Sequence, residues 1–208
     1  MASKIKGNLK KVYKEDKMSK AEPLRTNEDI EKMKNYFKKN DHIRDYALFI
    51  LGINTALRIS DLLKLKWEDV FDFERNVFVN HLVIREQKTH KRAVIMLNQN
   101  VKKALNELKA SIPIIKNKDY IFKSRKGNQS IHRSRAYCII KEAAKAEGIE
   151  GIISCHTMRK TFGYHAWKKG IPPAVIMDIY NHSSIEITKE YLSINQDDRD
   201  DVYKKILL

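Results

Sequence analysis

The sequence predicts a mainly helical domain with a small antiparallel β-sheet, an α+β fold. Two observations support this class. Apolar residues recur at helical spacing over most of the chain beyond residue 26. Residues 76–85 and 92–97 are instead rich in Val, Ile and Phe and flank the basic segment 86–91, which is typical of antiparallel strands joined by a turn. A length of 208 residues suffices for one domain with a buried core.

The helices are predicted from their capping residues and apolar patterns. Thr26 is a suitable N-cap, and Glu28 and Asp29 place acidic residues in the first turn of a helix that extends to about residue 39. The next helix begins at Asp41 and is apolar on most sides, so we expect it at the centre of the core. Further helices, separated by Gly148, Gly170 and Pro172-Pro173, are expected at 59–65, 98–110, 131–147, 156–169, 173–180, 184–193 and 197–206.

The chain is strongly basic. It has 41 Lys and Arg against 26 Asp and Glu, a formal net charge of +15 and a pI near 9.7. An excess of this size favours polyanionic partners, nucleic acid first among them, and predicts that any DNA binding weakens steeply with salt. Residues 1–23 are expected to form a basic N-terminal arm, or a merely solubilising tail, ahead of a single domain at 24–208.

Composition excludes several protein classes. Hydrophobic residues make up 42% of the chain and charged residues 32%, which fits neither a disordered chain nor a membrane protein. No apolar run reaches the roughly 20 residues that a membrane helix needs, and the N-terminus lacks the apolar stretch of a secretory signal. Cys138 and Cys155 have no metal-type spacing. We therefore expect reduced thiols, no metal site and a cytoplasmic, nucleoid-associated location.

Two basic segments in the first half of the chain are candidates for function. Arg58 lies between two apolar helices, where a charge is costly unless it is paired, and an ion pair with Asp61 is the natural choice when the segment is taken alone. A planar guanidinium can also hold two phosphate oxygens at once. The second segment is the turn that contains Lys88, which by itself would be taken as a solvated loop.

Three segments in the second half of the chain add titratable groups. His156 and Arg159 are three residues apart at the start of a helix, so their side chains share one face. Imidazole titrates near neutrality, which suits proton transfer. His182 follows a helix end, and Tyr191 comes nine residues after it. Taken singly, each could be a packing or capping residue.

Together, the order and spacing of these five segments resemble the tyrosine recombinase, or phage integrase, family. The resemblance runs from about residue 24 to the C-terminus and implies the fold of that family's catalytic domain. It implies that Tyr191 is the nucleophile and that His156 orients or deprotonates it. It also implies that Arg58 and Arg159 clamp the phosphate and that His182 donates a hydrogen bond to it. Asp61 would hold these groups in place.

The chain departs from the family pattern in the turn before His182, and it offers two candidates for the catalytic lysine. The family usually has Leu-Gly-His-Ser-Ser where this chain has Tyr180-Asn181-His182-Ser183-Ser184. Asn is the next-best residue after Gly for a left-handed helix end, so the turn is expected to survive. The family's catalytic lysine lies in a hairpin and protonates the leaving 5′-oxygen; Lys88 is the first candidate for it and Lys91 the second.

The resemblance implies DNA strand transfer without a cofactor. A tyrosine hydroxyl ionises near pH ~10, so it needs help to attack at neutral pH. Two arginines beside the phosphate favour both the phenolate and the charge of the transition state. The implied products are a 3′-phosphotyrosyl bond and a free 5′-hydroxyl. Because this ester is close in energy to a phosphodiester, rejoining needs no ATP, and we expect no metal.

The expected partner is double-stranded DNA, with no membrane and no small-molecule substrate. The segment after Tyr191 is expected to form an amphipathic helix that either docks on a neighbouring protomer, in a tetramer on DNA, or packs on its own domain. The N-terminal domain that clamps DNA in most of the family is not expected here, so the chain either resembles the short invertases of the family, which are nearly all catalytic domain, or is a fragment of a longer integrase. Contacts with the DNA backbone are expected from Lys91, Arg92, Lys123, Arg125, Lys126, Arg133 and Arg135.

Two rival functions stay open at this point. A type IB topoisomerase shares the chemistry but relaxes DNA as a monomer. A DNA-binding accessory protein would keep the fold without the reaction, although the full set of Arg58, His156, Arg159, His182 and Tyr191 argues against it.

Overall fold

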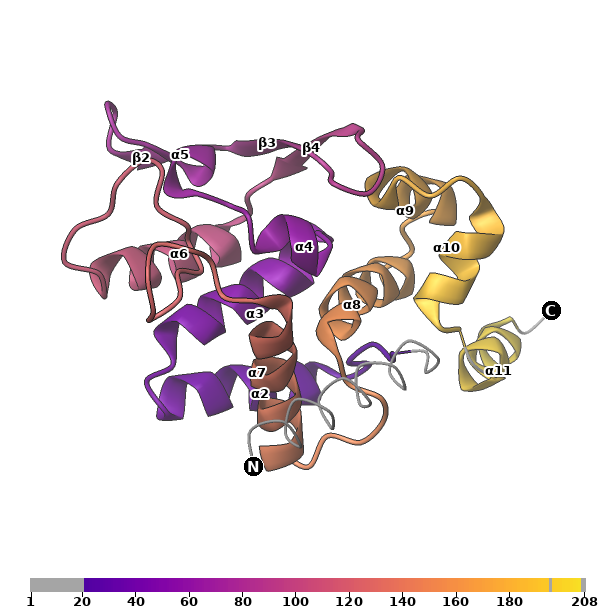
Figure 1. The fold of residues 1–208 in the computed structure, drawn as a ribbon. Coiled ribbons are helices and arrows are strands. Elements are labelled where there is room, and N and C mark those ends of the chain that lie inside the picture. Colours follow the sequence, from indigo (N-terminus) through magenta and orange to yellow (C-terminus); the bar gives the residue numbers. More distant parts are fainter. Residues whose placement is uncertain (1–20, 195, 207–208) are drawn as a thin grey trace, which may run out of the picture.

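A computed structural model describes residues 21–194 and 196–206 of the chain. The first 20 residues of the predicted N-terminal arm lie outside this range, and the domain boundary at residue 24 stays a prediction. Residues 21–23 lie against the domain, where the backbone N–H of Glu22 donates to the carbonyl of Ile152 at 2.9 Å. In chain order the helices and strands are α2 (Asn27–Lys39), α3 (Ile43–Thr55), α4 (Ile59–Leu62), α5 (Trp67–Val70), β1 (Phe71–Asp72), β2 (Val77–Phe78), β3 (His81–Arg85), β4 (Arg92–Met96), α6 (Gln99–Ala110), α7 (Arg133–Ala146), α8 (Cys155–Lys168), α9 (Pro173–Tyr180), α10 (Ile185–Leu192) and α11 (Gln196–Lys205) (Figure 1).

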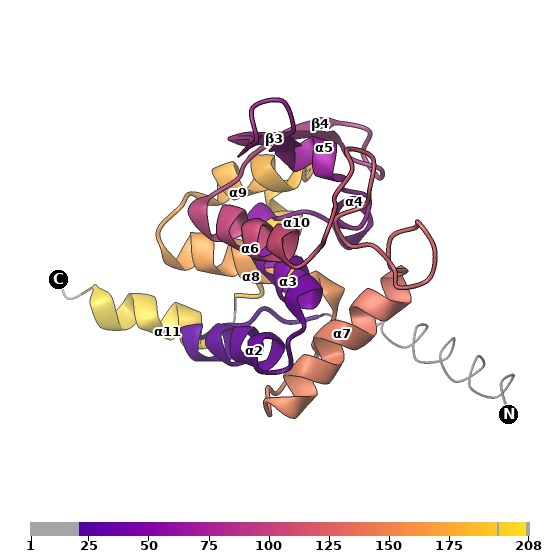
Figure 2. The same ribbon diagram turned by 90° about the vertical axis from the view of Figure 1, so that its left-hand side faces the viewer.

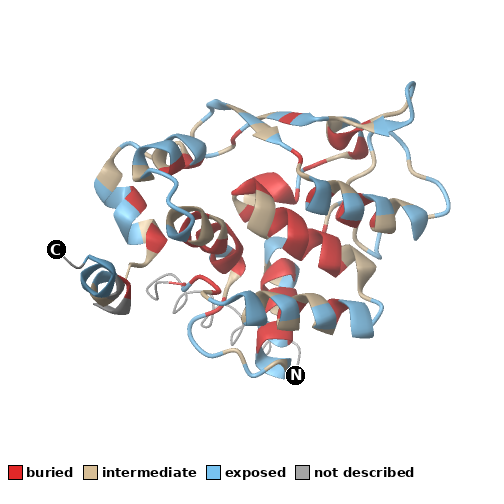
Figure 3. Cartoon of the chain, turned by 180° about the vertical axis from the view of Figure 1, so that it is seen from behind, coloured by how far each residue is buried: buried red, intermediate tan, exposed pale blue. Residues whose placement is uncertain are grey.

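Helix α3 forms the centre of the core, as the apolar pattern predicts. It packs against α2, α6 and α8, and most of its residues are buried (Figure 3). Gly52 permits the close approach of α8, because a Cβ at this position would collide with the sulfur of Met158. This close contact fixes α8, and therefore the residues that α8 carries, against the buried helix α3.

The sheet is where the structure differs from the expectation. Residues 76–85 were expected to be one strand, but they form β2 and β3, which belong to different sheets. Strand β2 pairs antiparallel with β1, and β3 pairs antiparallel with β4. The chain changes course at Asn80, whose carbonyl accepts from the backbone N–H of Leu97 at 2.9 Å rather than continuing the pairing of β2. The α+β class is confirmed, with two small antiparallel sheets instead of one.

Helices α8, α9 and α10 pack against one another in the C-terminal part of the domain. Helix α8 lies between α3 and α10, and the β3–β4 hairpin extends over α4 towards α9 (Figures 1 and 2). A small apolar cluster of Ala56, Ile176, Tyr180 and Leu192 joins the end of α3 to α9 and α10. This packing brings the segments around Arg58 and Tyr191, which are far apart in sequence, to one place. Within the part of the chain that the structure describes, no helix is long and apolar enough to cross a membrane.

Candidate active site

Arg159 is fixed by its surroundings before any ligand binds. Ser154 caps α8 by accepting the backbone N–H of His156 at 3.2 Å, so Arg159 lies in the second turn of the helix. Its guanidinium donates to the carbonyls of Ala56 and Tyr180, the latter at 2.8 Å, and lies 4.4 Å from the centre of the Tyr180 ring. The residue is 2% exposed. Nε of Arg159 has no hydrogen-bond partner among residues 21–194 and 196–206.

Arg58 lies beside Arg159. Its Nη2 donates to the same Tyr180 carbonyl at 3.4 Å, although Tyr180 is 122 residues away in sequence. Its Nη1 forms an ion pair with Oε1 of Glu86 at 2.7 Å. The partner of Arg58 is therefore Glu86, and not Asp61, which the sequence segment taken alone favours. Asp61 instead accepts the backbone N–H of Gln87 at 3.0 Å, so it holds the start of the hairpin turn.

Tyr191 meets the two histidines. Its hydroxyl is 3.3 Å from Nδ1 of His156, and its ring is 4.9 Å from the ring of His182 in an edge-on arrangement. The guanidinium of Arg159 lies 5.8 Å from the centre of the Tyr191 ring. Helices α8 and α10, with the turn between α9 and α10 that carries His182, thus bring the predicted nucleophile, both predicted histidines and one predicted clamp together.

Both histidines are neutral near pH 7. Loss of surrounding water, followed by the charges of Arg133, Arg159 and others, lowers the pKa of His156 to about 4, although the residue keeps contact with solvent. Loss of water and the charges of Arg159 and Arg58 lower the pKa of His182 to about 4 as well. In the tautomer that carries its proton on Nε2, Nδ1 of His156 accepts a hydrogen bond from the Tyr191 hydroxyl. This arrangement is suited to removing that proton.

The turn before His182 survives the replacement of glycine. Asn181 adopts the left-handed conformation with φ 52° at the end of α9, as expected for Asn in this position. Nδ1 of His182 is then 3.0 Å from Oγ1 of Thr188, which orients the ring towards the site. Ser184 caps α10 by accepting the backbone N–H of Ile187 at 3.4 Å.

Lys88 lies in the turn of the β3–β4 hairpin and is exposed. Its charge is among those that lower the pKa of His182, so it lies on the same side of the molecule as the site. Lys91, the second candidate for the catalytic lysine, is exposed at the end of the same turn. The choice between them stays a prediction in favour of Lys88.

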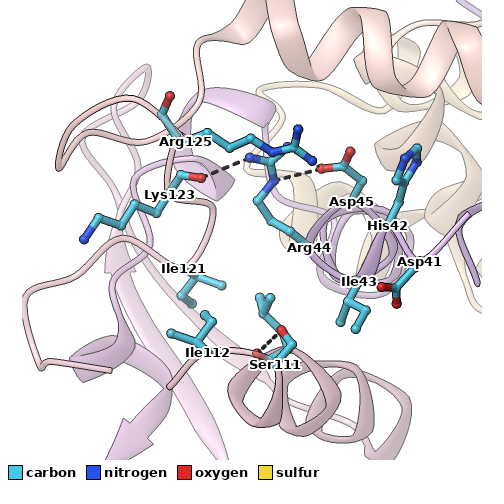
Figure 4. Close-up of a pocket in the computed structure, with 12 residues that line it drawn as sticks. Asp41, His42, Ile43, Arg44, Asp45, Ser111, Ile112, Ile121, Lys123 and Arg125 are labelled. Carbon is cyan, nitrogen blue, oxygen red and sulfur yellow. Dashed lines mark hydrogen bonds and ion pairs between the residues drawn. The ribbon is translucent and has the colours of Figure 1, made fainter. Parts of the chain in front are cut away.

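The predicted DNA-contact residues are not all in one place. Arg133 lies near the site, because its charge helps to lower the pKa of His156. Lys123 and Arg125 line a pocket of about 480 Å³ between the start of α3, the end of α6 and the loop at 121–125. There Arg44 donates to Asp45 and to the carbonyl of Lys123 (Figure 4). The remaining candidates, Lys91, Arg92, Lys126 and Arg135, are exposed.

Three residues of the site were not found from the sequence. Glu86 is 2% exposed and pairs with Arg58; the only signal is an acid at the end of an apolar strand before a basic turn. Tyr180 offers one carbonyl to both arginines. Lys160 is buried, with its Nζ 3.0 Å from Oγ of Ser193 and 5.5 Å from the Tyr191 ring centre. Its position next to Arg159 was the available signal.

The described residues contain no group of three or more His, Cys, Asp and Glu side chains that could hold a metal ion. Both cysteines are free thiols. Burial raises the pKa of Cys155 to about 12, so this thiol stays protonated and unreactive near neutral pH.

Comparison with known proteins identifies the family of the chain. The model of the phage integrase family matches residues 24–198. A curated protein named "Probable integrase/recombinase YoeC" from Bacillus subtilis (strain 168) is 40% identical over 183 residues, which cover 88% of this chain and 95% of that protein. A "Tyrosine recombinase" from Pseudothermotoga lettingae is 30% identical over 86% of this chain, which spans 59% of that relative's length.

Solved structures share the fold. The crystal structure of XerA recombinase has a TM-score of 0.71 at 22% identity and covers 88% of this chain and 63% of that one. A lambda integrase dimer bound to a core site has a TM-score of 0.65 at 19% identity, over 91% of this chain and 65% of that one. The family match extends over most of the chain and includes every predicted site residue. The chain belongs to the phage integrase family of tyrosine recombinases.

Proposed function

We propose that this chain is a site-specific DNA recombinase that cuts and rejoins DNA through a 3′-phosphotyrosyl bond to Tyr191. The observation that carries the proposal is the 3.3 Å approach of the Tyr191 hydroxyl to Nδ1 of the neutral His156, beside the fixed guanidinium of Arg159. A nucleophile, a base and a phosphate-binding cation are together in one place. The matching relatives are named integrases and tyrosine recombinases, which supports the same function.

The cleavage step follows from these positions. Oη of Tyr191 attacks the scissile phosphorus while its proton passes to Nδ1 of His156. The bond between phosphorus and the 5′-oxygen breaks, and Lys88 donates a proton to that oxygen. The covalent bond to tyrosine replaces one phosphate ester by another, so the reverse step, with a 5′-hydroxyl as nucleophile, rejoins the strand without ATP. The step as written uses no metal ion.

The two arginines stabilise the charge that develops on the phosphate. Arg159 has Nε free of described partners, and Arg58 lies beside it at the shared Tyr180 carbonyl. Because Arg159 is already held by two carbonyls, it needs little reorganisation when the phosphate arrives. His182, next to the Tyr191 ring, supplies a further hydrogen bond to the phosphate when its Nε2 carries the proton.

Double-stranded DNA is the proposed substrate. The solved structures of similar fold include a transposon integrase, XerH and lambda integrase in complexes with DNA. The net charge of +15 and the exposed basic residues Arg92, Lys126 and Arg133 supply the electrostatic attraction. We propose that the protein acts on DNA of the nucleoid, in the cytoplasm.

The C-terminal helix supports a proposal on assembly. Asp198 of α11 pairs with Arg25 and Lys168 of the same chain, each at 3.2 Å, so the first turn of α11 packs on its own domain. Beyond it, Val202 and Tyr203 are 50% and 79% exposed. We propose that these apolar residues contact a second copy in a tetramer on DNA. Cross-linking of the protein on bound duplexes, compared with a Val202→Asp variant, tests this; equal tetramer yields would contradict it.

Covalent trapping tests the function. The protein is mixed with a pool of duplexes of random sequence, each nicked a short distance beyond the test region, so that the short fragment that carries the released 5′-hydroxyl diffuses away. Wild-type protein is expected to form an adduct that survives denaturation, whose DNA can be sequenced to give the preferred site. Tyr191→Phe is expected to form none, and Tyr36→Phe, which removes a hydroxyl elsewhere, is expected to match wild type.

Three results would overturn the proposal. An adduct that persists in Tyr191→Phe would show that another residue is the nucleophile. DNA binding with no adduct from wild type on any duplex would favour an accessory DNA-binding protein. Relaxation of supercoiled plasmid by a monomer, without recombinant products, would favour a topoisomerase of type IB instead.

A further inference from the structure

Glu86 is the buried carboxylate at the centre of the site. Its Oε1 pairs with Arg58 at 2.7 Å. Its Oε2 accepts the hydroxyl of Thr89 at 2.6 Å and the side-chain amide of Asn181 at 3.1 Å. The residue is 2% exposed, and all three partners reach it from different segments of the chain. A carboxylate with one ion pair and two hydrogen-bond donors is held in one orientation.

Each partner of Glu86 belongs to a different part of the proposed machinery. Arg58 is itself a proposed phosphate clamp. Thr89 follows Lys88 in the hairpin turn, and Asn181 precedes His182 in the turn after α9. The backbone of Glu86 also closes the turn, since its N–H donates to the carbonyl of Lys91 at 3.0 Å. One carboxylate therefore joins three segments whose mutual placement the reaction requires.

The contact with Asn181 comes from a residue that departs from the usual pattern of the family. The sequence pattern of the family usually has glycine at this position, and glycine has no side chain to donate. Asn181 keeps the left-handed backbone, with φ 52°, and adds an amide whose partner is Glu86, 95 residues away. The backbone requirement and the side-chain contact are satisfied by the same residue.

We propose that Glu86 is a positioning residue of the active site, which fastens the turn carrying Lys88 and the turn carrying His182 to Arg58. Its effect on the reaction rests on the proposed recombinase function, whereas the fastening itself is a property of the protein without DNA. Removal of the carboxylate leaves the Arg58 charge without its counter-ion and removes one contact from each turn, while Asp61 still holds the backbone of Gln87.

The fastening is tested first without DNA, by amide hydrogen exchange of Glu86→Ala. The amides of residues 87–91 are expected to exchange about 10-fold faster than in wild type, because the turn loses a charge-assisted hydrogen bond. Asp45→Asn is the matched control, since Asp45 is also buried and pairs with Arg44 at 2.7 Å, but away from the hairpin. Unchanged exchange in Glu86→Ala, or equal acceleration in Asp45→Asn, would refute the fastening.

The effect on the reaction is tested by single-turnover adduct formation at saturating DNA, on the nicked duplex selected by wild type. Glu86→Ala is expected to be slowed about 100-fold, the cost of a small misplacement of reacting groups. Replacing the 5′-bridging oxygen by sulfur gives a leaving group that needs no proton, so the defect is expected to shrink on that DNA. A merely structural role would leave the defect the same on both.

A double-substitution cycle completes the test. Asn181→Gly keeps the left-handed turn and removes the amide, so a smaller slowing is expected. In the Glu86→Ala background it should add nothing, because the contact is already lost. Additive effects, or a wild-type rate in Glu86→Ala, would overturn the positioning role. Failure of wild-type protein to form any adduct would instead refute the proposed function, and hydrogen exchange would still decide whether Glu86 fastens the turns.

Discussion

Replacement of Arg159 by lysine separates the structural role of this residue from its charge. Arg159 donates to two buried carbonyls, those of Ala56 and Tyr180, and stacks 4.4 Å from the centre of the Tyr180 ring. A lysine Nζ keeps the charge but can reach only one of these carbonyls. The other carbonyl loses its donor at position 159; the Tyr180 carbonyl would then keep only the long 3.4 Å bond from Arg58. A buried acceptor that loses its donor costs stability.

The expected loss of stability follows from these contacts. A hydrogen bond from a charged donor contributes about 1.5–3 kcal/mol, and the cation–π contact about 1 kcal/mol. Loss of one bond and part of the ring contact gives about 3 kcal/mol for Arg159→Lys. In a domain of this size, that lowers the melting temperature by about 6–12 °C.

Thermal unfolding followed by circular dichroism measures this shift, with Arg58→Lys as the control. Arg58 makes one ion pair at 2.7 Å that lysine can keep and one long bond of 3.4 Å. Its replacement should therefore cost less than about 1 kcal/mol. An Arg159→Lys protein that melts within about 2 °C of wild type, or an Arg58→Lys protein that loses as much, would show that the two carbonyls do not fix Arg159 as argued.

Three further predictions concern other parts of the domain. Gly163→Ala would force a Cβ against the hydroxyl of the buried Tyr180, and is expected to cost about 1–3 kcal/mol in urea unfolding; an unchanged midpoint would show that the ring can move. His156 and His182 have pKa values near 4 in the folded chain, below the ordinary 6.5, so the unfolded chain binds their protons first and stability should fall as pH drops from about 6.5 to 4. Replacement of both histidines by Asn should make the stability less dependent on pH in this range. An equally steep loss of stability in that variant would show that the two histidines do not cause it. Asp198→Asn removes the carboxylate that ties α11 to the domain and should speed proteolysis after α10, whereas unaltered cleavage would show that α11 is held by other contacts.

The sequence determined much of the local structure. Apolar periodicity predicted the positions of the long helices, and the N-cap at Thr26 accepts the backbone N–H of Asp29 at 3.0 Å, as its spacing implies. The left-handed turn at Asn181 was also predictable. These features depend on the backbone preferences of a few neighbouring residues, which the sequence displays directly. The order of Arg58, His156, Arg159, His182 and Tyr191 sufficed to identify the family.

The strand prediction failed where a distant partner decides the outcome. Residues 76–85 have continuous strand character, but β2 pairs with β1, and β3 pairs with β4. Strand propensity reports a pleated, half-buried environment and does not say which segment supplies the partner. The break at Asn80 is set by pairing across the sheet, so no local signal marked it.

Only the tertiary structure decided how the site residues meet. The sequence segment around Arg58 favoured Asp61 as its partner. In the structure Arg58 forms its ion pair with Glu86, and Asp61 accepts the backbone N–H of Gln87. The shared carbonyl of Tyr180 is equally invisible in the sequence. Local preferences act over one or two helical turns, but these contacts join segments that become neighbours when α8 packs between α3 and α10. The sequence therefore determined which residues are candidates for the site, and the packing of these helices determined which of those residues are in contact.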